Sequence, residues 1–401
     1  MRVIPYGRQW IDDDDLSAVK EALNSDYLTT GPAVEAFEKA LASKVDAKYA
    51  VVCSSATAAL HLASIAVGIT TNHWVIVPAI TFVATANAVR FQGANILFVD
   101  VNKSTGLLEK HHVKSLLDEN RDKNISAIFP VHLNGQSVDM KSISEIAQEF
   151  GLKVIEDGCH AIGTSMQGEN NRQYKVGSCD YSDACVFSFH PVKTITMGEG
   201  GAITTNDEDI YNNLLLHRNH GMTRDMEQFK NSDHIFDSKD KQEPWYYEMQ
   251  SLGYNYRASD INCALGLSQL NKLDKFAIKR IELTKYYDKE LKQFEEYIQP
   301  IAKVEKSNSV LHIYAVHIDF DELNISRVEL IKELMKNNIF TQVHYIPVCN
   351  QPYYVSLYGE NNLPGAEYYY KHVLSLPLFP AMTLEDIDYI IATLKKILIN
   401  S

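Results

Sequence analysis

The chain has 401 residues, of which 45% are hydrophobic and 22% charged, and its formal net charge is −13. This composition is typical of a globular protein with one large and one smaller domain, and the acidic excess argues against a nucleic-acid-binding surface. The six scattered cysteines form no Cys-x-x-Cys pair, so reduced thiols are favoured over a disulfide framework. With no signal-peptide core and no apolar stretch of transmembrane length, we expect a cytoplasmic protein without a membrane partner.

Strand-like and helix-like segments alternate through roughly the first 250 residues, which is the pattern of an α/β fold with a mostly parallel sheet. In chain order we expect strand 49–53, helix 56–67, strand 75–77, helix 81–91, strands 96–99 and 127–131, helix 138–150, and strands 154–155, 184–187 and 202–204.

The character of the sequence changes after these elements. Residues 224–245 are polar and poorly patterned, and we interpret them as a long surface excursion. Helices are predicted at 261–273 and 279–294, followed by a mixed α/β segment. We therefore expect a large domain at 1–255 and a small domain at 256–401, with no internal repeats.

Lys193 carries the strongest chemical signal. It follows a strand in the run Ser-Phe-His-Pro-Val-Lys and precedes a glycine-rich turn, where apolar and small residues indicate close packing. Lysine is rarely buried without a function, and burial lowers its pKa. Upstream, Asp157 ends an apolar strand. A lysine that forms a Schiff base, with a carboxylate that pairs with a pyridine nitrogen, is the requirement of pyridoxal phosphate (PLP) chemistry.

Two segments could hold the phosphate of such a cofactor. Ser55, Ala56 and Thr57 lie between a strand and a helix, where backbone N–H groups and the helix dipole favour an anion. Taken alone, this segment favours the interpretation as an ordinary helix cap, because small polar residues cap helices in most proteins. Ser188, five residues before Lys193, could offer a hydroxyl to the same phosphate.

Other candidates are less specific. Phe82 begins a helix after a strand and could stack on a planar ring, although such an aromatic is more often part of the core. His160 could orient Asp157 or contact a ring hydroxyl, although a lone histidine is usually structural. The adjacent pair His111-His112, in a polar segment, has no recognisable zinc-ligand spacing, and we expect no metal.

Together these motifs resemble the DegT/StrS family of nucleotide-sugar aminotransferases, from about residue 4 to the C-terminus. The resemblance rests on the Lys193 segment, on Asp157-Gly-Cys-His-Ala, on Ser55-Ala-Thr and on Gly253-Tyr-Asn-Tyr-Arg. It implies the fold-type I architecture of PLP-dependent transferases, similar to aspartate aminotransferase, with a mostly parallel seven-stranded sheet and a smaller C-terminal α/β domain.

Within the family, the sequence is most similar to the C4 transaminases of pseudaminic-acid biosynthesis. Leu23-Asn-Ser, Leu28-Thr, Ala264 to Leu270 and Gln342-Val-His-Tyr support this likeness. It implies amino transfer from glutamate to C4 of a UDP-linked 4-keto-6-deoxy sugar, for bacterial surface glycans or glycoproteins. It also implies a homodimer with shared active sites, because Asn255 would reach the cofactor phosphate of the neighbouring subunit.

The resemblance assigns further roles residue by residue. Lys193 would shuttle the proton, and Asp157 would pair with the pyridine nitrogen. The other cofactor-binding residues would be Ala56, Thr57, Phe82, His160, Ser188 and Asn255. The substrate-binding residues would be Tyr6, Asp26, Tyr27, Leu28, Thr29, Asn255, His312, His344 and Tyr345.

The sequence departs from the family pattern in two segments, and two alternative functions have to be weighed against this interpretation. Segments 167–185 and 224–245 look longer than usual in the family, and both could border the substrate site. A PLP-dependent sugar dehydratase has the same fold, but some such enzymes replace the lysine with histidine, and Lys193 is present here. A non-catalytic regulator would carry a DNA-binding module or lack the lysine, and this chain does neither.

Overall fold

The computed structural model describes residues 3–168, 172–231, 235–236 and 243–399. Its centre is a seven-stranded sheet in which β9 runs antiparallel to both neighbours and the other strand pairs are parallel. The strands, in sheet order, are β1 (Tyr49–Cys53), β9 (Gly201–Thr205), β8 (Ala184–Ser188), β5 (Lys153–Asp157), β4 (Ile125–Ile128), β2 (Trp74–Pro78) and β3 (Asn95–Val99). The expected mostly parallel sheet is confirmed.

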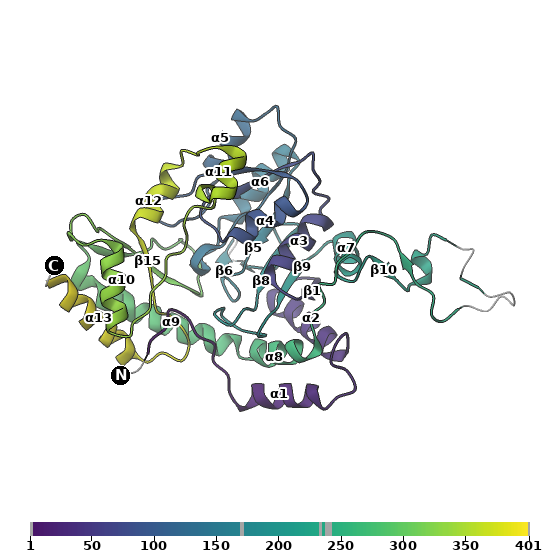
Figure 1. Ribbon diagram of the computed structural model, residues 1–401, viewed down its shortest axis with the longest axis horizontal. Helices are drawn as coiled ribbons and strands as arrows, with labels where there is room; N and C mark the ends of the chain where they lie inside the picture. The colour runs from purple at the N-terminus through teal and green to yellow at the C-terminus, as the bar shows by residue number, and fades with distance from the viewer. Residues whose placement is uncertain (1–2, 169–171, 232–234, 237–242, 400–401) are drawn as a thin grey trace.

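Helices cover this sheet, as its strands require, because strands β8 and β9 are buried along their whole length. Helices α3 (Ala56–Ala66), α4 (Val83–Phe91) and α7 (Glu208–Arg218) form one group, since α3 contacts both of the others. The remaining helices of this part are α1 (Asp13–Leu23), α2 (Pro32–Val45), α5 (Lys110–Glu119), α6 (Met140–Phe150) and α8 (Asp260–Asn271). Figure 1 shows α1, α2 and α8 stacked below the sheet.

The C-terminal part has its own antiparallel sheet and its own apolar core. The sheet consists of β12 (Ile298–Pro300), β14 (Tyr314–Ile318) and β15 (Val373–Leu376). The helices are α9 (Leu273–Glu290), α10 (Arg327–Lys336), α11 (Pro352–Tyr358), α12 (Pro364–His372) and α13 (Leu384–Ile399). The core runs from Leu283 to Leu394 and includes Ile4 from the N-terminal segment. The division of the chain at residue 255 stays a prediction, since α8 packs on α1 and α2.

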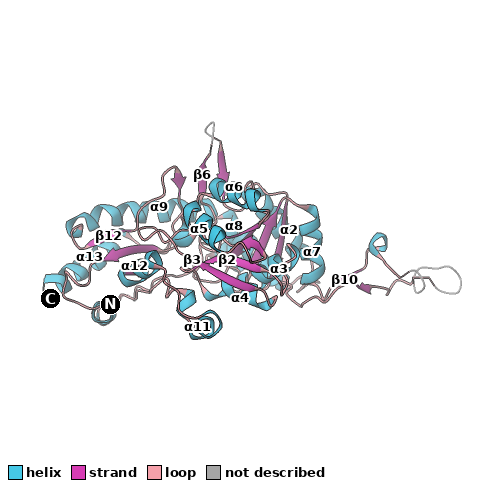
Figure 2. Cartoon of the chain, turned by 90° about the horizontal axis from the view of Figure 1, so that it is seen from above, coloured by secondary structure: helices cyan, strands magenta, loops and turns pink. Residues whose placement is uncertain are grey.

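Two smaller pairings complete the fold. β10 (Met222–Thr223) and β11 (Glu248–Met249) form the base of an arm that projects from the body in both views (Figures 1 and 2). The arm contains the described part of the predicted 224–245 excursion; residues 232–234 and 237–242 lie outside the described residues. β6 (Ser165–Gln167), β7 (Gln173–Lys175) and β13 (Ser307–Asn308) form a third small sheet around the 167–185 segment, of which 169–171 lie outside the described residues.

Several expected boundaries differ from the structure. The strand predicted at 127–131 ends at Ile128, and the buried residues after it form a loop. The segment with His111 and His112 was expected to be merely polar, but it forms α5, which buries only Val113 and Leu117. Among the described residues, no helix combines the length and the apolar character needed to span a membrane.

Candidate active site

A cavity of about 480 Å³ lies where the ends of β5 and β8 meet the first turn of α3. Lys193, Asp157 and Ser188 all line it, together with Ala56 and Thr57. This is the position that a parallel sheet favours for ligands, at the carboxyl ends of its strands. The structure therefore brings the residues singled out as cofactor-binding into one pocket, except Asn255.

Lys193 lies in the turn that follows β8. Its N–H donates to the carbonyl of His190 (2.9 Å), and the segment returns to the strand through a bond from the N–H of Met197 to the carbonyl of Phe189 (2.9 Å). Burial lowers the pKa of the Lys193 amine, and nearby Cys159 and Asp157 partly oppose this effect. Among the described residues, no hydrogen bond or ion pair ends on this amine. It is free to react with a carbonyl group.

Asp157 ends β5, and its carboxylate is held by two donors. The hydroxyl of Thr85 donates to Oδ2 (2.7 Å), and the N–H of Cys159 donates to Oδ1 (3.1 Å). The Thr85 hydroxyl is also 2.8 Å from that of Thr81, which lies four residues earlier, just before α4. Both threonines are buried. These bonds fix the direction of the carboxylate toward the cavity that it lines.

Thr85 was missed by the sequence reasoning. The only available signal was the spacing of Thr81 and Thr85, four residues apart at the start of an expected helix that follows a strand. Nothing in the sequence indicated that Asp157, 72 residues away, would lie against this turn.

Replacing Thr85 with valine is expected to weaken cofactor binding about tenfold, because it removes one hydrogen bond to a carboxylate at constant volume. Fluorescence or absorbance titration of the apoprotein with PLP measures this change. The matched control is Thr205→Val, which removes a buried hydroxyl bonded to the carbonyl of Asp183 (2.7 Å) away from the pocket. Equal PLP affinities for the two variants would contradict the role of Thr85.

The phosphate end of the pocket depends on a close approach of β9 to the start of α3. Gly201 pairs with Cys53 on one side and Ser188 on the other. A Cβ atom on Gly201 would lie 2.4 Å from the carbonyl carbon of Ser55 and 2.5 Å from the nitrogen of Ala56. Glycine at position 201 therefore permits this close approach, and Ser188, Ala56 and Thr57 line one part of the cavity, which we call the phosphate recess.

The N-terminus of α3 supplies the donors of this recess. Ser55 is the N-cap residue, and its hydroxyl accepts from the N–H of Ala58 (3.1 Å). The N–H groups at the start of a helix have no intrahelical partner, and the dipole there favours an anion. Ala56 and Thr57, which begin the helix, line the cavity. The arrangement suits a phosphate group.

Phe82 precedes α4 and is 56% exposed, although it lines the cavity. Its ring centroid lies 6.0 Å from that of Tyr345. An exposed aromatic ring at the wall of a cavity is available to stack on a planar ligand. The core-packing alternative for Phe82 does not fit this exposure.

Three buried histidines, His160, His312 and His344, also line the cavity. His160 accepts from the N–H of Asn134 (3.3 Å) at Nδ1 and bonds through Nε2 to the hydroxyl of Tyr345 (3.1 Å). One interpretation of the sequence was that His160 orients Asp157, but the hydrogen bonds of the His160 ring go to Asn134 and Tyr345 instead. The ring of His312 lies 4.8 Å from that of His160, and its Nδ1 is buried with no hydrogen-bond partner among the described residues. His344 bonds to the hydroxyl of Ser375 (2.9 Å).

These histidines are neutral near pH 7. Burial lowers the pKa of His160 and His312 well below the usual range, and the positive charge of Lys193 adds to the effect. The same two causes lower the pKa of His344 to about 3. The wall therefore offers neutral donors and acceptors rather than cations, which suits a ligand rich in hydroxyl groups.

The residues expected to bind substrate fall into two groups. Tyr6, His312, His344 and Tyr345 line the cavity. The others do not line the cavity of their own chain: Asp26, Tyr27, Leu28, Thr29 and Asn255.

This second group faces outward. The N-terminal members lie between α1 and α2, where the side chains of Tyr27 and Leu28 are exposed. Asn255 is also exposed and forms a β-bridge with Asn219. The 167–185 and 224–245 segments contribute no described residue to the cavity of this chain. Lining residues to which the sequence analysis assigned no role include Thr81, His190, Glu199 and Gln342.

Within the part of the chain that the structure describes, a cluster of potential metal ligands lies outside the pocket. Potential ligand atoms of Glu109, His111 and His112 lie within 4.8 Å of one another at the start of α5. The positive end of a helix dipole disfavours a cation at this place. None of the three lines the candidate active site.

The residues of the pocket fit PLP in kind and in arrangement. The Lys193 amine, which has no hydrogen-bond partner among the described residues, matches the aldehyde, and the fixed carboxylate matches the pyridine nitrogen. The part of the cavity lined by Ser188, Ala56 and Thr57 matches the phosphate. The exposed Phe82 matches the planar ring.

Comparison with known proteins agrees with this geometry. The sequence model of the DegT/DnrJ/EryC1/StrS aminotransferase family matches residues 9–395. A Campylobacter jejuni protein (serotype O:23/36, strain 81-176) named UDP-4-amino-4,6-dideoxy-N-acetyl-beta-L-altrosamine transaminase is 38% identical over 396 residues, 99% of this chain and 98% of the relative.

Two solved structures are similar over the whole chain. Helicobacter pylori PseC, described as an aminotransferase involved in the biosynthesis of pseudoaminic acid, gives a TM-score of 0.86 at 30% identity and covers 100% of both chains. The PLP form of Streptococcus pneumoniae Spr1654 gives a TM-score of 0.85 at 26% identity and covers 100% of this chain and 99% of that one. The same protein has also been solved in a PMP form.

Proposed function

Because the chain belongs to the DegT/DnrJ/EryC1/StrS aminotransferase family and is a PLP-dependent nucleotide-sugar aminotransferase, we propose that it aminates C4 of a UDP-linked 4-keto-6-deoxy amino sugar. Glutamate is the proposed amino donor, and the product supplies surface glycans. The observation that carries the proposal is the single cavity that contains the Lys193 amine, the Asp157 carboxylate and the phosphate recess. The name of the 38% identical relative supports the sugar and the carbon.

When bound, PLP supplies an aldehyde that carries the amino group and a conjugated ring that accepts an electron pair. Asp157 would pair with the pyridine nitrogen, in the orientation that Thr85 and Cys159 fix. Ser188, Ala56 and Thr57, which line the cavity, would hold the phosphate, and Phe82 would stack on the ring. Each of these residues would hold or orient the cofactor, and none of them would exchange a proton with the sugar.

Lys193 performs the proton transfer. Burial lowers the pKa of its amine, so the neutral form is accessible and Nζ can accept a proton as well as return one. We propose that Nζ delivers this proton to C4 of the sugar. Tyr6, His344 and Tyr345 lie on the wall where the sugar would bind, and His312 offers its unpaired Nδ1 to a sugar hydroxyl.

The substrate is tested by offering glutamate with a panel of UDP-, dTDP- and GDP-linked 4-keto sugars. Mass spectrometry and NMR of the product identify the sugar and the aminated carbon. We expect a UDP-linked 4-amino sugar and a dependence on added PLP. Amination at another carbon, or dehydration of the sugar without amino transfer, would overturn the proposal.

We further propose a homodimer in which Asn255 reaches the cofactor phosphate of the partner subunit. Asn255 is exposed and lies outside the pocket of its own chain. The segment around it and the neighbouring arm expose large apolar side chains, among them Trp245 (66%), Met249 (62%) and Leu252 (74%). Such exposure is typical of a protein–protein interface. The cytoplasm is the proposed compartment, where six free cysteines stay reduced.

Co-expression of a Lys193→Ala chain with an Asn255→Ala chain tests the shared site. Random pairing makes half of the dimers mixed, and each mixed dimer has one site with both native residues, so about a quarter of the wild-type activity is expected. Each variant alone should be far less active. A mixture no more active than the mean of the two separate variants would exclude sharing.

A further inference from the structure

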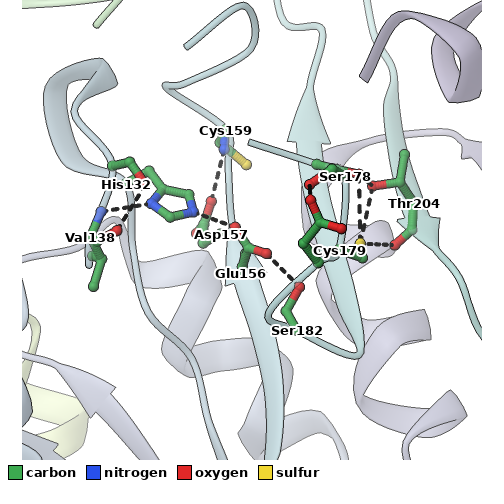
Figure 3. Close-up of polar contacts among 12 residues, drawn as sticks. His132, Val138, Glu156, Asp157, Cys159, Ser178, Cys179, Ser182 and Thr204 are labelled. Atoms are coloured by element: carbon green, nitrogen blue, oxygen red, sulfur yellow. Dashed lines mark hydrogen bonds and ion pairs between the residues drawn. The ribbon is translucent and has the colours of Figure 1, made fainter. Parts of the chain in front are cut away.

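A network of hydrogen-bonded polar side chains lies on the face of β5 opposite Asp157. Glu156 precedes Asp157 on the strand, so their side chains point to opposite faces of the sheet. Nε2 of His132 lies 2.7 Å from one carboxylate oxygen of Glu156, and the hydroxyl of Ser182 bonds to the other. Figure 3 shows Glu156 between these two partners. Neither His132 nor Glu156 lines the cavity.

The tautomer of His132 follows from its second contact. Nδ1 accepts a hydrogen bond from the N–H of Val138 (3.1 Å), so in the neutral ring Nε2 carries the proton and donates to Glu156. The side chains of His132 and Glu156 are 0% and 5% exposed. Every polar atom of the pair that can bond therefore has a partner, which is what a buried pair needs to hold one geometry.

The pair connects the end of β5 to the loop after β4, and that loop shapes the pocket. The backbone N–H of His132 donates to the carbonyl of Asp157 (3.0 Å), and the N–H of Asp157 donates to the carbonyl of Pro130 (2.8 Å). The same loop contributes Val131 to the cavity wall. It also places the N–H of Asn134 on Nδ1 of His160.

Ser182 extends the connection to the next strand. It lies in the turn before β8, the strand that leads to Ser188 and Lys193. Glu156 therefore links three neighbouring segments: the loop after β4, the end of β5 and the entry to β8. Breaking this link would let the backbone at Asp157 and the ring of His160 shift relative to Lys193.

We propose that His132 and Glu156 are positioning residues for the reaction, which hold Asp157 and His160 in register with the cofactor from behind the sheet. This inference rests on the proposed pairing of Asp157 with the pyridine nitrogen. The hydrogen bonds of Glu156 carry the effect, not its charge. Glutamine can accept from His132 and donate to the Ser182 oxygen, so it preserves the link, whereas alanine removes it.

The test compares Glu156→Ala with Glu156→Gln by PLP titration of the apoprotein and by the pH midpoint of the absorbance change of the bound cofactor. Glu156→Ala should weaken PLP binding by about tenfold or more, the usual range for a residue that orients a ligand-binding group, and should shift the midpoint. Glu156→Gln should stay within about threefold of the wild type. His132→Asn, too short to reach Glu156, replaces Glu156→Ala if that variant does not fold.

Asp386→Ala is the matched control, because it removes a buried carboxylate of the C-terminal domain that does not line the pocket. It should lower thermal stability without changing PLP affinity or the midpoint. Wild-type PLP affinity in Glu156→Ala would overturn the proposal. An equal loss of PLP affinity in Glu156→Gln would also overturn it, because the effect would then depend on the charge of Glu156 and not on its hydrogen bonds. Asp157→Asn distinguishes a failure of this inference from a failure of the proposed function. If Glu156→Ala alone leaves PLP binding unchanged, only the positioning role fails. If Asp157→Asn also leaves PLP binding unchanged, the assignment of the cofactor site fails as well.

Discussion

Replacing Lys193 with alanine is expected to abolish steady-state amino transfer, with a loss of about 10⁴-fold or more, because the same amine is the attachment point and the proton carrier. The amine lines the cavity, and burial lowers its pKa. Stopped-flow absorbance and product analysis measure the loss. Borohydride treatment of the wild type should fix the cofactor to the peptide that contains Lys193, and mass spectrometry identifies that peptide.

Two further variants define the cause of this loss. Lys193→Arg keeps a positive charge but has no accessible neutral form, so it should be as inactive as Lys193→Ala. Lys153→Ala removes a lysine at the other end of β5, paired with Asp183 on the surface, and should remain active. Sustained turnover by Lys193→Ala, or borohydride labelling at another lysine, would refute the assigned role.

Replacing Asp157 with asparagine is expected to lower kcat by about 10²–10³-fold, since a neutral amide cannot stabilise a protonated pyridine nitrogen. The change keeps the size of the side chain: the N–H of Cys159 can still donate to the single amide oxygen, and the hydroxyl of Thr85 can accept from the amide NH2. PLP affinity should fall as well. The absorbance spectrum of the bound cofactor, recorded across pH, reports the loss of the partner charge independently of activity.

Asp183→Asn is the control for this prediction. Asp183 lies in the turn before the neighbouring strand and pairs with Lys153 and the N–H of Val154, away from the cavity. Its replacement should leave the cofactor spectrum unchanged. If Asp157→Asn bound PLP as tightly as the wild type and kept its pH dependence, another group would have to pair with the pyridine nitrogen.

Elements with strong apolar patterns could be predicted closely from the sequence. The strand expected at 49–53 is β1 (Tyr49–Cys53), and those expected at 184–187 and 202–204 differ from β8 and β9 by one residue at one or both ends. Continuous apolar runs bounded by small residues leave little choice of structure. Helix α5 was missed because it buries only two apolar residues and its exposed face is rich in charge and histidine.

The residues at the cofactor end of the site could also be predicted from the sequence, because they lie in short motifs. Lys193 and Ser188 are five residues apart, and Ala56 and Thr57 are adjacent. The hydrogen-bond partners of the site residues could not be predicted from the sequence. Thr85 meets Asp157 across 72 positions, and Tyr345 meets His160 across 185. Such pairs depend on which strands become neighbours, and no local pattern contains that information.

The sequence by itself determined the alternation of strands and helices, and it placed a reactive lysine and a strand-end carboxylate in chain order. Hydrophobic periodicity and turn chemistry act over a few residues, so both can be read locally. Only the tertiary structure decided that Asp157 is held from one face of the sheet by Thr85 and backed on the other by Glu156 and His132. It also decided that Asn255 faces outward. The physical reason is that sheet order and burial are properties of the whole chain, set by how all its apolar surfaces pack together.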